Sequence, residues 1–242
     1  MKQYKMAEIS KLSQYEYLKQ SIDYTYHDKY DEQREALHIE IINKYFENKF
    51  TESSNTTKLI FTQGAYGAGK SNVMRALHKN GKINLDNYVY VDQDKLRVHI
   101  PEYQQYLRDD LFTAGFKTNK ETGYLAELIQ KHALFNNYNL IVDGSMRDHV
   151  WYIEYINWIK EKFPRYEIAI LYVEASYVNI LERNLLRGEV TKRCIPLYCL
   201  KEAFEKCPIS FEILKNHVDK FYKVNNDTEE NKQNDIVNIN FI

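Results

Sequence analysis

The chemistry most plainly encoded in this sequence is phosphate binding, by one short glycine-rich stretch. Its eight residues read GAYGAGKS and fit the pattern G-x-x-x-x-G-K-[ST]. Glycines let backbone N–H groups turn towards a phosphate, and a helix that begins directly after the loop favours an anion. We expect Lys70 to reach the β- and γ-phosphates and the Ser71 hydroxyl to bind Mg²⁺. The predicted nucleotide-binding residues are Gly64, Ala65, Tyr66, Gly67, Ala68, Gly69, Lys70 and Ser71.

Two carboxylates follow the next apolar stretch, YVYVD. If that stretch is a strand beside the loop, Asp92 and Asp94 lie at the sheet edge where α/β proteins bind ligands. In an extended chain, residues two apart point to one face, so we expect both to face the γ-phosphate, where one accepts a proton from an attacking hydroxyl. A helix N-cap at Asp94 is the structural alternative. Asp92 and Arg97, in the same segment, are assigned to the substrate side.

A third acidic position, Asp143, ends the apolar segment in NLIVDGSMRD. A carboxylate at the end of a buried strand beside the loop would orient Mg²⁺, directly or through water. Asp143 is therefore assigned, with Ser71, to the metal, and also to the substrate side. Arg147 follows at a distance from which it could meet a phosphate.

Cationic side chains gather later, in LERNLLRGEVTKRCIP. Arg183 and Arg187 are four residues apart and so share one helical face. We expect Gly188 to permit a turn into a flexible basic lid that ends with Lys192 and Arg193. Such a lid would stabilise charge on a phosphoryl group during transfer. The alternative is a solvated basic helix face.

Apolar segments that alternate with helical patterns must position these residues. Strands are expected at 58–62, 88–92, 138–142 and 166–173, and helices at 71–79, 101–113, 120–136, 148–162 and 177–187. This alternation predicts a three-layer α/β fold with a mostly parallel central sheet flanked by helices. Towards the C-terminus we expect two short helices at 195–207 and 209–218, strand-like segments at 219–224 and 235–241, and a loop over the polar run 225–235.

The overall composition excludes several classes of protein. Hydrophobic residues make up 44% of the 242 residues, enough for a sizeable core, and the net charge of −1 argues against non-specific nucleic-acid binding. No apolar run approaches the length of about 18 residues that spans a membrane. The N-terminus has no apolar signal-peptide core. We therefore expect a soluble, cytoplasmic protein, with export by an uncleaved signal left open.

Taken together, the loop, the D-x-D pair, Asp143-Gly144-Ser145 and the late arginines resemble the zeta toxin family of small P-loop kinases over about residues 58–215. The resemblance implies a P-loop kinase domain at 58–242 and does not cover residues 1–57. There the helix-like spacing of Leu37, Ile41, Ile42, Tyr45 and Phe46 predicts an N-terminal helical extension. The resemblance also implies ATP and Mg²⁺ as cofactors and phosphorylation of the 3′-hydroxyl of the sugar of UDP-N-acetylglucosamine. By the same resemblance Lys70 is catalytic, Asp94 is the base, Glu127 contacts the sugar substrate, and Arg183 and Arg193 hold the phosphates.

Two departures from the family pattern concern the acceptor more than the reaction. The family usually has Glu-Gly-Thr where this chain has Asp143-Gly144-Ser145, and the aromatic stretch 149–158 differs as well. The alternatives are a kinase of a nucleoside, a nucleotide, a dinucleotide such as NAD or a nucleic-acid end, and, from another class, a non-catalytic nucleotide-binding module. The expected partners are ATP, a small acceptor such as a nucleotide sugar, and an inhibitory protein. No membrane partner is expected, and nucleic acid is disfavoured.

Overall fold

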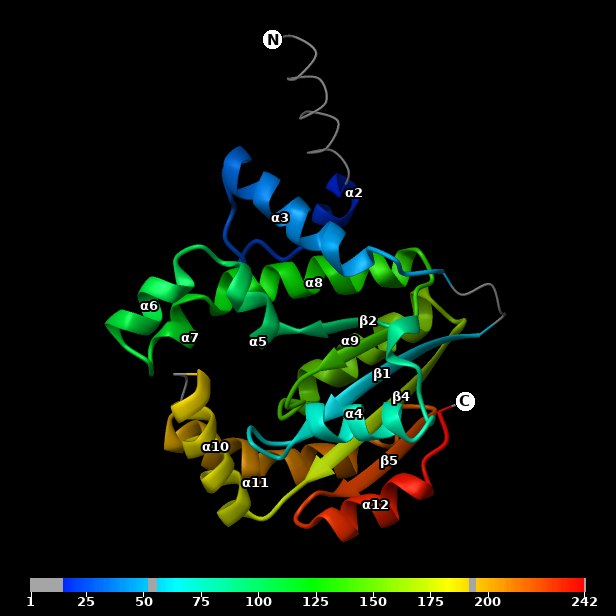
Figure 1. Cartoon of the computed structure of the whole chain (residues 1–242). Coiled ribbons are helices and arrows are strands. Elements are labelled where there is room, and N and C mark those ends of the chain that lie inside the picture. Colours follow the sequence, from blue (N-terminus) through cyan, green and yellow to red (C-terminus); the bar gives the residue numbers. More distant parts are fainter. Residues whose placement is uncertain (1–14, 52–55, 192–194, 242) are drawn as a thin grey trace.

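A five-stranded parallel sheet forms the centre of the computed structural model, which describes residues 15–51, 56–191 and 195–241 (Figure 1). The strands are β1 (Thr57–Gln63), β2 (Val89–Asp92), β3 (Leu140–Asp143), β4 (Tyr166–Glu174) and β5 (Lys220–Asn225). Their order is β2-β3-β1-β4-β5, and every pair is parallel. The central strand β1 is buried along nearly its whole length, as expected of a strand covered on both faces.

Helices cover both faces of this sheet and confirm the predicted three-layer α/β fold (Figure 1). On one face lie α4 (Lys70–Lys79) and α12 (Glu229–Val237), and on the other α9 (His149–Lys162) and α11 (Leu197–Leu214). The remaining elements are α2 (Glu16–Lys19), α3 (Glu32–Phe46), η1 (Leu85–Asn87), α5 (Gln93–Leu96), η2 (Arg97–His99), α6 (Tyr103–Asp109), α7 (Ala114–Lys117), α8 (Asn119–Phe135) and α10 (Tyr177–Thr191). In the described part of the chain, no helix is long and apolar enough to span a bilayer.

The N-terminal helices pack onto α8, which in turn lies against β2 and β3. Leu18 of α2 and Ile41 and Ile42 of α3 are fully buried, so this part shares the hydrophobic core of the sheet domain. Helical spacing around Ile41 and Ile42 correctly predicted α3. The boundary between residues 57 and 58 stays a prediction.

Two predictions for the C-terminal part were wrong. A single helix, α11, replaces the two short ones and continues through Pro208. Although proline cannot donate the usual backbone hydrogen bond, the buried side chains on either side of it keep one helical face against the core. The expected loop at 225–235 and strand at 235–241 are largely α12 instead. The Thr228 side chain accepts a hydrogen bond from the backbone N–H of Asn231, and this N-cap starts the helix within a polar run.

Two further predictions need correction beside the site. The helix expected at 101–113 is shorter, because α6 ends at Asp109 and α7 begins only at Ala114. The turn expected at Gly188 is absent, since α10 continues through it to Thr191. Arg183 and Arg187 therefore project from one continuous helix. Arg193 lies outside the described residues.

Candidate active site

The loop Gly64–Ser71 joins the central strand β1 to the first turn of α4, as the sequence predicts. Lys70, the first residue of that helix, donates hydrogen bonds from Nζ to the carbonyl oxygens of Gly64 (3.0 Å) and Ala65 (3.4 Å). Its ammonium group therefore lies across the mouth of the loop, 4.0 Å from Oδ1 of Asp143. If phosphate oxygens replaced these neutral carbonyl oxygens as acceptors, the hydrogen bonds of Lys70 would become stronger, because both partners would then be charged.

Two glycines of the loop are required by the packing around them. Gly64 has φ +142°, and a Cβ there would lie 2.2 Å from the carbonyl oxygen of Val173. Gly69 has φ +91°, and a Cβ there would lie 2.2 Å from Nδ2 of Asn226. The same Asn226 nitrogen donates to the carbonyl oxygen of Ala68 at 2.7 Å. The loop is thus packed against the end of β4 and against the residue that follows β5.

Asp143 stands at the end of β3, next to the hydroxyl of Ser71, in the arrangement expected of a magnesium site. Ser71 Oγ donates to Asp143 Oδ2 at 3.4 Å, Thr62 Oγ1 donates to Oδ1 at 2.8 Å, and Tyr90 OH donates to Oδ2 at 3.1 Å. Burial and the nearby Asp143 raise the pKa of Tyr90, so its hydroxyl stays a neutral donor. A hydroxyl and one carboxylate, both hard oxygen ligands, suit Mg²⁺, which usually keeps waters and takes phosphate oxygens as well. The described residues include no cluster of three acidic, His or Cys side chains for a metal, which agrees with this sparse ligand set.

Asp92 is the neighbour of Asp143 across the sheet, at the paired position of β2. Its side chain accepts hydrogen bonds from the backbone N–H groups of Asp94 (2.9 Å) and Lys95 (3.4 Å), so it is the N-cap of α5. The expectation that Asp92 and Asp94 point to one face of an extended chain was therefore wrong, as was the alternative of an N-cap at Asp94. Burial and the charges of Asp143 and Asp94 raise the pKa of Asp92. A cation bound beside Asp143 would relieve this repulsion.

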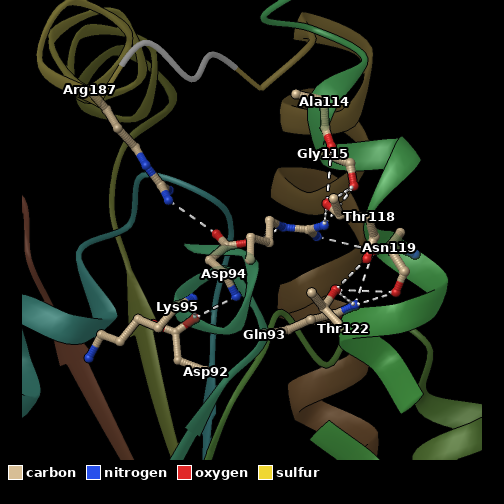
Figure 2. Close-up of polar contacts among 11 residues, drawn as sticks. Asp92, Gln93, Asp94, Lys95, Ala114, Gly115, Thr118, Asn119, Thr122 and Arg187 are labelled. Atoms are coloured by element: carbon tan, nitrogen blue, oxygen red, sulfur yellow. Dashed lines mark hydrogen bonds and ion pairs between the residues drawn. The ribbon is translucent and has the colours of Figure 1, made fainter. Parts of the chain in front are cut away.

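Asp94 lies in the first turn of α5, where its carboxylate meets two arginines (Figure 2). Arg187 of α10 donates to Oδ2 at 3.1 Å, and Nε of Arg97 donates to Oδ1 at 3.4 Å. The Asp94 side chain remains about one-quarter exposed, at 27%. Asp94 is thus a charged, fixed carboxylate that a ligand can still approach.

Arg97, which was assigned to the substrate side, is buried among protein groups, with 4% of its surface exposed. Its Nη1 donates to the carbonyl oxygen of Gly115 and to Oγ1 of Thr118, both at 2.6 Å. Its Nη2 donates to Oδ1 of Asn119 at 3.2 Å. The guanidinium therefore ties Asp94 to the α7–α8 junction (Figure 2).

Arg183, one turn before Arg187 on α10, lies over the phosphate loop. It donates from Nη1 to the carbonyl oxygens of Gly67 (3.4 Å) and Ala68 (3.3 Å), and from Nη2 to that of Asn226 (2.6 Å). Arg183 and Arg187 share one face of α10, so Arg183 lies beside the loop and Arg187 contacts Asp94.

Arg147 approaches the loop from the other side, in the segment between β3 and α9. Its Nη1 donates to the hydroxyl of Tyr66 at 3.4 Å, and the guanidinium lies 5.9 Å from the centre of the Tyr66 ring. Its second neighbour is Glu202, 3.9 Å from Nη2. Arg147 thus lies beside Tyr66 of the loop, and its phosphate contact stays a prediction.

Glu127 is on α8, where the N-terminal part of the chain holds it. Its Oε2 is 2.8 Å from Nε2 of His27, and its Oε1 is 2.7 Å from Nζ of Lys131. Both partners are buried, whereas the Glu127 side chain is 30% exposed. His27 also lies near Gly123, which packs against Gln93 at the start of α5. The region around Glu127 is thereby linked to the segment that carries Asp94.

Sequence reasoning missed several contributors to this site. Thr62 and Tyr90 support Asp143, Asn226 supports the loop, and His27 supports Glu127. A signal existed for Thr62 alone, as a polar residue at the end of an otherwise apolar strand. His27 and Asn226 are separated from their partners by 100 and 158 positions, so no local pattern could reveal them.

A model of the zeta toxin family matches residues 42–239. Among solved structures, the chain is similar to one from the PezAT chromosomal toxin–antitoxin system of Streptococcus pneumoniae, with a TM-score of 0.67 and 18% identity over 82% of this chain and 79% of that one. It is also similar to a structure of AvrRxo1-ORF1:AvrRxo1-ORF2 with sulphate ions, with a TM-score of 0.56 and 14% identity over 79% and 64% of the two chains. At these identities the structural matches show the fold alone. No curated protein matches the sequence significantly.

Proposed function

We propose, because the chain belongs to the zeta toxin family of nucleotide-dependent kinases, that it transfers the γ-phosphate of ATP to a hydroxyl group of a small metabolite. The observation that carries this proposal is the position of Asp94. Its carboxylate is fixed by Arg97 and Arg187 at the same sheet edge as the phosphate loop and Asp143. In a kinase, a carboxylate in that position can orient the acceptor hydroxyl and take its proton.

In this reaction the acceptor oxygen attacks the γ-phosphorus in line, its proton passes to the Asp94 carboxylate, and ADP leaves. Lys70 and Arg183 meet the phosphates, since both now donate to carbonyl oxygens of the loop that surrounds the phosphate position. Ser71 and Asp143 would hold Mg²⁺, which when bound neutralises charge on the β- and γ-phosphates. For the acceptor hydroxyl to reach Asp94, it has to share or replace the contact with Arg187.

For the acceptor we propose a nucleotide sugar, with the 3′-hydroxyl of the sugar of UDP-N-acetylglucosamine as the first candidate. The family supports this choice, and so do the positions of Glu127 on α8 and of Arg147 in the segment between β3 and α9. Arg147 would meet a diphosphate and Glu127 a sugar hydroxyl. An inhibitory protein partner is part of the proposal, because the similar structure from Streptococcus pneumoniae belongs to a toxin–antitoxin system.

The deciding experiment is incubation of the full chain with ATP and Mg²⁺, once with UDP-N-acetylglucosamine and once with a metabolite extract, followed by mass spectrometry. The expected product is the acceptor with one added phosphate, formed together with one ADP. Lys70→Ala is the matched control, because it should form none. Phosphorylation of an extract metabolite but not of UDP-N-acetylglucosamine would support the kinase reaction and refute UDP-N-acetylglucosamine as its acceptor. ATP binding without turnover in either mixture would refute catalysis and favour a nucleotide-binding module.

A further inference from the structure

A cavity of about 650 Å³ lies on the α4 side of the sheet and borders the site described above at Ser71 and Tyr90. Its walls come from the end of α3, from one face of α4 and from β2 with the start of α5. Four cationic side chains line it: Lys44, Lys49, Arg75 and Lys95. We refer to this cavity as the basic groove. Ser71 of the phosphate loop also lines it.

The charge of the basic groove is only partly compensated. In the described part of the chain, Lys44 and Arg75 have neither an ion pair nor a hydrogen-bond partner, and both are exposed. Lys49 donates to the backbone carbonyl oxygen of Asp86 at 2.8 Å, and Lys95 lies 4.6 Å from the centre of the Tyr90 ring. The carboxylate of Asp86 lies near Lys49, and that of Asp92 lies near Lys95.

Aromatic surface accompanies these cations. Tyr45 and Tyr90 are part of the lining, and both are half-buried. Burial, together with the charge of Asp92, raises the pKa of Tyr45, so its ring carries a neutral hydroxyl. Lysine and arginine bind phosphate groups by charge-assisted hydrogen bonds, whereas tyrosine rings stack on nucleobases. The volume is within the range of about 300–1,000 Å³ that is usual for small-molecule sites.

We propose that the basic groove is a second ligand site, which binds a nucleotide with its phosphates at Lys44, Arg75 and Lys95 and its base on Tyr45. This site is distinct from the place of the acceptor. Asp94 and Lys95 extend from α5 in different directions (Figure 2): the Asp94 carboxylate points to Arg187, whereas Lys95 lines the groove. A nucleotide in the groove therefore lies beside Ser71 without reaching the proposed base.

The test uses the full chain with its phosphate loop saturated by a non-hydrolysable ATP analogue and Mg²⁺, so that UDP cannot bind at the loop. UDP is the probe, titrated in a calorimeter at low ionic strength. One UDP should bind per chain in the groove, separately from UDP on the proposed acceptor side, and the Kd of the groove should rise with salt because exposed charges are screened. Lys44→Gln and Arg75→Gln should each raise that Kd about tenfold, the effect of about one lost charge-assisted hydrogen bond.

Two variants serve as controls. Lys79→Gln removes an exposed cation one turn further along α4, outside the groove, and should leave the Kd of UDP unchanged. Arg147→Gln removes the cation on the proposed acceptor side; it should weaken UDP binding on that side and leave the Kd of the groove unchanged. Thermal unfolding of Lys44→Gln and Arg75→Gln should match the unmodified chain, since both side chains are exposed.

Three results would overturn the groove as a nucleotide site. They are the absence of UDP binding at millimolar concentration, binding that Lys44→Gln and Arg75→Gln leave unchanged, and binding that only Arg147→Gln weakens. The last would place UDP on the acceptor side. Because ATP turnover is measured separately, failure here leaves the proposed kinase reaction intact, and failure of that reaction leaves the groove intact.

Discussion

Replacement of Arg97 is the sharpest test of how the proposed base is positioned. Arg97 is buried, and its guanidinium donates to the carbonyl oxygen of Gly115, to Thr118, to Asn119 and to Asp94. Arg97→Met keeps most of the side-chain volume and removes every one of these hydrogen bonds. The acceptors that it leaves behind are in or near the interior, where an unpaired polar group costs free energy.

The magnitude follows from the two shortest contacts. Hydrogen bonds from a charged donor contribute about 1.5–3 kcal/mol each, and the contacts to Gly115 and Thr118 are both 2.6 Å long. Because losses within one network are not additive, we expect Arg97→Met to lower the free energy of unfolding by about 3–5 kcal/mol, the range for a broken buried charge pair. Arg97→Lys keeps the positive charge but not the forked guanidinium group. It should lower the free energy of unfolding by less, about 1–3 kcal/mol.

The assay combines urea unfolding with kinetics. Arg108→Met is the matched control, because Arg108 is exposed and donates a hydrogen bond to the exposed Gln105; it should change the free energy of unfolding by less than about 0.5 kcal/mol. Arg97→Lys should stay folded. Its kcat should fall because Asp94 loses the hydrogen bond from Arg97, whereas the Kd of ATP should stay constant because the phosphate loop keeps all its contacts. A loss in Arg97→Met no larger than in Arg108→Met would refute the buried network. An unchanged kcat in Arg97→Lys would refute its role in positioning Asp94.

Three other substitutions test separate parts of the site. Lys70→Ala should abolish ATP consumption, measured as ADP release, and leave the melting temperature nearly unchanged; turnover at the normal rate would remove the loop assignment. Asp94→Asn should lower kcat at saturating substrates by about 10²–10⁴, the usual effect of a general base, and a loss of only a few-fold would contradict that role. Asp92→Asn should raise the melting temperature more at about pH 7 than at about pH 4. The reason is that the raised pKa of Asp92 makes its ionisation unfavourable in the folded chain, a cost that appears as the pH rises above the normal carboxyl range, while Asn still caps α5. An equal change at both pH values would show that repulsion at Asp92 is not the cause.

The parts of the fold that could be predicted are those whose local pattern agrees with their tertiary setting. Strands β1, β3 and β4 are short apolar runs buried on both faces, and the sequence shows them as such. The sequence did not predict α12 because this helix has no apolar stripe: its only buried residues are Lys232 and Ile236. Lys232 is held by hydrogen bonds to Asn72 and Glu229, and Asn72 is 160 positions away.

The candidate site divides in a similar way. Lys70, Ser71 and Asp143 could be predicted because a loop motif and a strand end fix them locally. The orientation of Asp94 could not, since it depends on whether β2 ends at Asp92 or continues two residues further. The strand ends there because the Asp92 side chain accepts two backbone N–H groups and turns the chain into α5. One side-chain cap thus reverses the direction that alternation in a strand implies for Asp94.

The helix α10 connects the two halves of the proposed reaction. Arg183 contacts the phosphate loop and Arg187 contacts Asp94, and the two arginines are one turn apart on a helix that is unbroken at Gly188. The guanidinium of Arg183 now donates hydrogen bonds to carbonyl oxygens of the loop. The phosphates of a bound triphosphate would be stronger acceptors, because they are charged. Because both side chains project from one helix, any movement of α10 would change both contacts together.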